Sequence, residues 1–68
     1  MQISARNQLK GKVKSVSLGG IMAEVVIDIG GSEVVAAITR NSAESLGLKE
    51  GKEVIAVIKA TEVMVAVE

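Results

Sequence analysis

The polar residues that could do chemistry gather near the amino terminus, between Ser4 and Gly11. The run Ser4-Ala5-Arg6-Asn7-Gln8-Leu9-Lys10-Gly11 holds a hydroxyl, a guanidinium, two carboxamides and an ammonium group, and it holds no carboxylate. These groups donate N–H and O–H hydrogen bonds, and the planar guanidinium suits a pair of anionic oxygens. The run therefore indicates binding of a small anion. The alternative is a solvated first strand whose polar side chains hold no ligand.

Further donors are scattered along the chain. Thr39 and Ser42 fall at a strand end and at a helix start, and Lys59 and the backbone of Ala60 close another strand. Four or five hydrogen bonds to a charged group, at about 1.5–3 kcal/mol each, could reach the roughly 8 kcal/mol of micromolar affinity. A pocket between subunits could bring these distant groups together.

Catalytic groups of the usual kinds are missing. The chain has no His and no Cys, and its eight Asp and Glu residues form no obvious inward pair. Ser42 and Ser45 have no base to activate them, and the glycine pairs connect strands instead of leading a strand into a helix. We therefore expect no enzyme, no catalytic residue and no bound metal cation.

Composition narrows the class of protein. The 68 residues predict one domain, residues 1–68, and a chain this short buries only roughly 60% of its unfolded surface. Since 49% of residues are hydrophobic and none is aromatic, we expect other subunits to supply part of the stability. No secretory signal pattern and no apolar run of about 18 residues occurs. We expect a cytoplasmic protein without membrane contact.

Nucleic-acid binding is not favoured. Eight basic and eight acidic residues give a net charge of zero, and no aromatic side chain is available for base stacking.

Hydrophobic alternation predicts a small all-β fold. The first strand, Leu9–Leu18, changes phase and should bend near Lys14-Ser15. The other strands are Ile21–Ile29, Glu33–Thr39, Glu53–Lys59 and Val63–Val67, with glycine pairs at positions 19–20 and 30–31 as hairpin turns. A short helix, Asn41–Leu48, lies between the third and fourth strands; Asn41 is the predicted cap, and Thr39 and Ser42 compete for that place. This order predicts a five-stranded Greek-key barrel of the OB type.

Several apolar residues fall on faces that a barrel would turn outward. They predict an extensive subunit interface, although isolated exposed aliphatic side chains are ordinary. The residues are Val26, Val35, Ile55, Val57 and Met64.

Three motifs in this order resemble the Mop family, the molbindins. They are Ser4-Ala5-Arg6-Asn7-Gln8, Val35-Ala36-Ala37-Ile38-Thr39 and Val57-Ile58-Lys59-Ala60-Thr61. The resemblance covers essentially the whole chain. It implies a homohexamer, built as a trimer of dimers, that binds molybdate or tungstate at subunit interfaces and so stores and buffers the oxyanion.

The resemblance also implies which residues bind the oxyanion. Matched by position, they are Ser4, Arg6, Thr39, Ser42, Lys59 and Ala60. Structural roles compete at each: Ser4 as a surface hydroxyl, Thr39 or Ser42 as a helix cap, and Lys59 as a solvated lysine. An OB-type module that binds a pterin or single-stranded nucleic acid is the alternative function.

Overall fold

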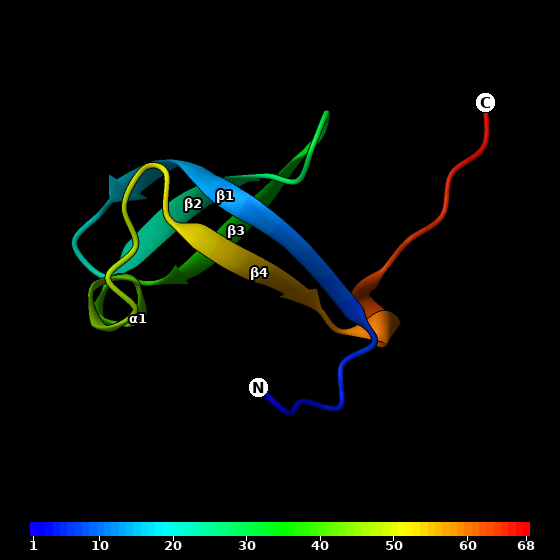
Figure 1. Ribbon diagram of the computed structural model, residues 1–68, viewed down its shortest axis with the longest axis horizontal. Coiled ribbons are helices and arrows are strands. Elements are labelled where there is room, and N and C mark those ends of the chain that lie inside the picture. The colour runs from blue at the N-terminus through cyan, green and yellow to red at the C-terminus, as the bar shows by residue number, and fades with distance from the viewer.

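The computed structural model describes residues 1–68, which form one curled antiparallel sheet and a short helix (Figure 1). The elements in chain order are β1 (Asn7–Leu18), β2 (Met22–Asp28), β3 (Glu33–Thr39), α1 (Arg40–Ser45), β4 (Glu53–Ile58) and a 3₁₀ turn, η1 (Ala60–Glu62). The helix between the third and fourth strands is where the sequence predicts it. No helix here has the length and apolar character needed to cross a membrane.

The long first strand organises the sheet. The strand order is β3-β2-β1-β4, so β1 pairs with both β2 and β4, and each neighbouring pair is antiparallel. The β1–β2 register shifts between Val13 and Ser15, which confirms the predicted bend. At Gly11 a Cβ atom would overlap the backbone oxygen of Asp28, so only glycine fits where β1 crosses the end of β2.

The core is small because no aromatic side chain fills it. Six residues are buried, and the largest of them are valine and isoleucine side chains. They are Val13, Ala23, Val25, Ile27, Ala43 and Ala56. Ala43 is the buried residue of α1, and the helix lies at one end of the curled sheet (Figure 1).

The hairpin at Gly30-Gly31 follows the sequence expectation. Both glycines have positive φ, 91° and 92°, a region that β-branched and bulky residues avoid. The Asp28 carboxylate accepts a hydrogen bond from the Gly30 N–H and steadies this turn. The predicted Gly19-Gly20 turn is wrong: the Gly19 N–H donates to the Met22 carbonyl, so Gly20 and Ile21 form the turn, and neither Gly19 nor Gly20 has positive φ.

The helix begins earlier than predicted. Its N-cap is Thr39, whose hydroxyl oxygen accepts a hydrogen bond from the Ser42 N–H at 3.1 Å, and Asn41 lies inside the first turn. The predicted Asn41 cap is therefore wrong, and the competing Thr39 cap is correct. Thr39 ends β3 in an extended conformation, which is the backbone geometry that an N-cap needs.

The predicted fifth strand is wrong for the isolated chain, which has four strands and no closed five-stranded barrel. After η1 the tail runs away from the sheet as an extended segment (Figure 1), and Val65 and Val67 are 89% and 91% exposed. Its alternating valines fit a strand, but a strand also needs a neighbour to bond with, and the tail has none here. What remains is a small all-β domain of OB-like character.

An apolar groove lies beside the two edge strands of the sheet. Strands β3 and β4 are the two edges of the sheet, and they are not paired with one another. The groove measures about 440 Å³ and all 14 of its lining residues are hydrophobic; they come from β2, β3, β4 and the segment after α1.

Candidate functional site

Four of the six predicted site residues share one hollow at the open end of the β1–β4 ladder. We call it the Arg6–Lys59 hollow; it measures about 560 Å³. Its lining residues are Ile3, Ser4, Ala5, Arg6, Val57, Lys59, Ala60 and Thr61. The prediction from sequence thus joined two segments that are more than fifty residues apart, and the fold brings them together.

Strand register explains how the two cations meet. The β1–β4 ladder ends at the pair Asn7 and Ile58, so continuing the same register sets Arg6 opposite Lys59. Like charges in directly opposite positions are destabilising in an antiparallel pair. A fold that keeps these two together is suited to an anion between them.

The charges in the hollow are uncompensated. None of the lining residues is acidic, and neither Arg6 nor Lys59 takes part in an ion pair. The ion pairs of the structure lie elsewhere: Lys14 with Glu33, and Arg40 with Glu44 at 3.6 Å. The hydrogen bond and the charge of Glu33 raise the pKa of Lys14.

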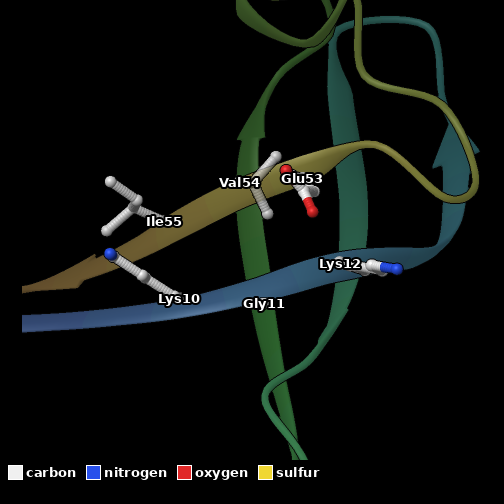
Figure 2. A pocket seen from close by; sticks show the side chains of 6 residues that line it. All are labelled: Lys10, Gly11, Lys12, Glu53, Val54 and Ile55. Atoms are coloured by element: carbon white, nitrogen blue, oxygen red, sulfur yellow. The ribbon is translucent and has the colours of Figure 1, made fainter.

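A second depression shows the contrast (Figure 2). It lies on β1 and β4, measures about 530 Å³, and is lined by Lys10, Gly11, Lys12, Glu53, Val54 and Ile55. The ammonium groups of Lys10 and Lys12 point in different directions, and the Glu53 carboxylate lies between the strands at the same place (Figure 2). This depression does not concentrate positive charge.

Thr39 and Ser42 lie at the other end of the sheet. Thr39 pairs with Met22, at the end of β2 that lies beside Leu18, the last residue of β1. The hollow adjoins Asn7, the first residue of β1. The 12 residues of β1 separate these ends by about 36 Å along the strand. One copy of the chain therefore does not bring all six predicted residues together.

Thr39 and Ser42 nevertheless form a local pair of donors. The Thr39 hydroxyl donates to Ser42 Oγ at 2.8 Å and also accepts the Ser42 N–H, and both residues are exposed. We call them the helix-start pair. Their helix-cap role, which the sequence left open, is therefore present in the chain.

Two polar residues beside these sites, Arg40 and Thr61, are not predicted from the sequence. Arg40 adjoins the helix-start pair, and its guanidinium donates to the Gly19 carbonyl at 3.1 Å, which ties the first hairpin to the helix. Thr61 lines the Arg6–Lys59 hollow directly after Ala60. A hydroxyl immediately following a Lys-Ala strand end was the available signal for Thr61.

The structure holds no group of three or more His, Cys, Asp or Glu side chains placed to share a metal ion.

Taken together, the fold and the hollow define a small β-domain with a cationic, carboxylate-free depression suited to an oxyanion. Residues 3–65 match the TOBE domain. Among curated relatives, molybdenum-pterin-binding protein 3 of Clostridium pasteurianum is 58% identical over 66 residues, which are 96% of this chain and 97% of that protein. The chain therefore belongs to the TOBE-domain family and is a Mop-family protein, which confirms the resemblance seen in its motifs.

Solved structures agree with the assignment. MopII from Clostridium pasteurianum superposes with a TM-score of 0.91 at 51% identity, covering 97% of this chain and all of that chain. The cytoplasmic molybdate-binding protein ModG, in a crystal form with molybdate bound, gives a TM-score of 0.84 at 51% identity, covering 88% of this chain and 43% of that chain.

Proposed function

We propose that this protein binds molybdate, and tungstate with it, and so stores and buffers the oxyanion in the cytoplasm without covalent chemistry. The observation that carries the proposal is the meeting of Arg6 and Lys59 in one hollow that has no acidic lining residue. The naming of relatives as molybdenum-pterin-binding and molybdate-binding proteins, one of them cytoplasmic, supports the same ligand and compartment. Residues 1–68 would act as one Mop domain.

The proposed ligand shell combines charge and neutral donors. Arg6 supplies two parallel N–H donors, Lys59 supplies a point charge, and Ser4 supplies a hydroxyl. We propose the backbone N–H near Ala60, a residue that lines the hollow, as a further donor. Such charge-assisted hydrogen bonds contribute about 1.5–3 kcal/mol each, so four or five of them could reach the roughly 8 kcal/mol of micromolar affinity.

The second part of the shell would come from another copy. Thr39 and Ser42 are the remaining predicted ligands, and they lie at the far end of the sheet from the hollow. We propose that the helix-start pair of one copy faces the Arg6–Lys59 hollow of its neighbour. A site divided in this way is complete only at a subunit interface.

The tail and the groove support an assembly of copies. The groove between β3 and β4 is apolar throughout, and the tail carries valines at positions 63, 65 and 67, on one side of an extended strand. We propose that the tail of a second copy lies in this groove as the fifth strand of the barrel. The exchange would be reciprocal in a twofold dimer, because both copies carry the same tail and the same groove.

Four of the five apolar residues that the sequence places on outward faces are exposed in the isolated chain. Val35 is 61% exposed, Ile55 and Val57 are each 40% exposed, and Met64 is 93% exposed, whereas Val26 is half-buried. Val35, Ile55 and Val57 also line the groove, so only the part of each side chain that the tail leaves uncovered is available to a further copy. We propose that these parts and Met64 carry a second kind of contact between dimers, which builds a trimer of dimers.

A pterin is the second candidate ligand, because relatives of this chain are named molybdenum-pterin-binding proteins. Flat heterocycles are usually held by stacking on aromatic side chains, and this chain has none. The cationic hollow, which has no aromatic and no acidic lining residue, favours the oxyanion.

Calorimetric titration of the purified protein tests the proposal. Molybdate should bind at micromolar concentration or below, while a pterin and a single-stranded oligonucleotide should give no heat. Arg6→Ala and Lys59→Ala should each weaken molybdate binding about 10- to 100-fold, the loss of one charge-assisted contact.

Lys12→Ala is the matched control, since Lys12 is an exposed β1 lysine outside the hollow. It should bind molybdate as the unchanged protein does. Equal affinity of the protein for sulfate, phosphate and molybdate would contradict a molybdate function. Normal binding by both the Arg6 and Lys59 variants would contradict the site.

A further inference from the structure

Two carboxamides lie beside the Arg6–Lys59 hollow without lining it. Asn7 and Gln8 belong to the donor-rich run of the amino terminus, yet neither is among the residues that line the hollow. Their N–H groups are directed at the chain's own carbonyls. They are therefore not ligands in this structure, and their position calls for another role.

Asn7 links the two segments that carry the cations. Its Nδ2 donates to the Ile58 carbonyl oxygen at 3.2 Å, across 51 residues of sequence. Asn7 directly follows Arg6, and Ile58 directly precedes Lys59. The half-buried Asn7 side chain thus fastens the ladder at its last pair, immediately before the two cations.

Gln8 fixes the segment on the other side of Arg6. Its Nε2 donates to the Ala5 carbonyl oxygen at 2.6 Å, which closes a short loop through Ala5, Arg6 and Asn7. The backbone before β1 is held by this bond at the point where Ser4 and Arg6 line the hollow. Gln8 is itself exposed, so its bond restrains local geometry and contributes little to the core.

Without an anion, the two cations repel. Repulsion between opposed like charges favours fraying of a ladder end, where no further pair holds the strands. Fraying would separate Arg6 from Lys59 and raise the ordering cost of binding. A restraint that is present before binding lowers that cost.

We propose that Asn7 and Gln8 are positioning residues for the oxyanion site. Asn7 holds Arg6 opposite Lys59, and Gln8 holds the Ser4–Arg6 segment in its binding conformation, so that the hollow exists before the anion arrives. This inference rests on the proposed function, because it concerns the same site. It assigns to the two carboxamides a role in affinity that is separate from ligand contact.

Molybdate titration of Asn7→Ala and Gln8→Ala, with oligomer mass and thermal unfolding measured in parallel, tests the assignment. Each variant should weaken binding about fivefold, the value of one hydrogen bond, with oligomer mass unchanged. Gln2→Ala is the matched control, because Gln2 is an exposed carboxamide with no hydrogen bond and no place in the hollow. Gln2→Ala should bind normally.

A double variant separates positioning from a general loss of stability. In a Lys59→Ala background there is no second cation to position, so adding Asn7→Ala should cost little further affinity. The same fivefold loss in both backgrounds, or normal binding by both Asn7→Ala and Gln8→Ala, would overturn the inference. Because Gln8 is exposed, Gln8→Ala remains informative even where Asn7→Ala unfolds.

A ligand-free measurement distinguishes this inference from the proposed function. NMR order parameters of the Ala5 and Arg6 backbone should be lower in Gln8→Ala than in the unchanged protein when no anion is present. If the unchanged protein does not bind molybdate, the proposed function is refuted, and the order parameters still test the restraint. Unchanged order parameters would refute the restraint even where molybdate binds.

Discussion

Replacing Val65 by aspartate tests the proposed seating of the tail. Val65 is 89% exposed in the isolated chain, and it occupies the middle of the alternating series of valines at positions 63, 65 and 67. If the tail of one copy fills the groove of another, this side chain moves from water into a channel lined only by hydrophobic residues. An aspartate would carry an unpaired charge into that channel.

The magnitude follows from burial. Full burial of a valine side chain contributes about 1.5–3 kcal/mol, and an unpaired carboxylate in its place adds a penalty of several kcal/mol. A reciprocal exchange counts each loss twice, so Val65→Asp should weaken the dimer by about 6 kcal/mol or more, a factor of about 10⁴. A dimer with nanomolar dissociation would then separate at ordinary working concentrations.

Sedimentation equilibrium across a concentration series measures this effect. The unchanged protein should remain oligomeric, and Val65→Asp should fall to the 7.0 kDa monomer. Ala66→Asp is the control, because residue 66 points to the opposite side of an extended strand. Ala66→Asp should remain at least dimeric. A Val65→Asp protein with the mass of the unchanged oligomer would refute the seating of the tail.

Three further predictions concern the single chain. Thr39→Ala should lower the free energy of unfolding by about 1 kcal/mol in denaturant titration, and Thr39→Ser should restore it, because Thr39 is the observed N-cap; no loss would contradict the cap. Gly11→Ala should destabilise by about 1–3 kcal/mol, since its Cβ would meet the Asp28 backbone, whereas the open Gly20→Ala control should change little. Glu33→Gln should remove the hydrogen bond and the charge that raise the Lys14 pKa. The contribution of this ion pair to folding stability is present below the ordinary lysine pKa of 10.5 and is lost as pH rises through the raised pKa. The thermal stabilities of the variant and the unchanged protein should therefore converge only at more alkaline pH.

Much of the sheet could be predicted from local pattern. The third strand has the predicted bounds, Glu33–Thr39, and the bend of β1 falls where the alternation of apolar residues changes phase. The strand bounds and the bend both depend only on residues close in sequence, because side chains alternate with a period of two along a strand. The helix also appears between the predicted strands, one residue early at its start.

The predicted fifth strand shows that the alternation of apolar residues does not report whether a pairing partner is present. Alternation at positions 63–67 reports a segment that can form a strand, but a strand forms only where a partner offers free N–H and C=O groups. In one chain that partner is absent, and the segment stays extended and exposed. Whether a second copy supplies the partner depends on the assembly, which local periodicity does not encode.

The candidate site could likewise be predicted only in part. Ser4, Arg6, Lys59 and Ala60 could be joined by pairing the first strand with the fourth, and the register does join them. The sequence could not place Thr39 and Ser42 relative to that hollow. Their distance from it depends on the end of the sheet at which each strand terminates. The roles of Asn7 and Gln8 depend on side-chain directions that their residue types leave open.

Mixed assemblies test most directly whether each site is shared between copies. Lys59→Glu disables the Arg6–Lys59 hollow, and Ser42→Asp disables the helix-start pair by adding negative charge while suiting a helix N-terminus. Each variant alone should bind no molybdate. When the two are unfolded, mixed in equal amounts and refolded together, about one quarter of the interfaces should combine an intact hollow with an intact helix-start pair and bind molybdate. Mixed assemblies that bind none would contradict a site shared between copies.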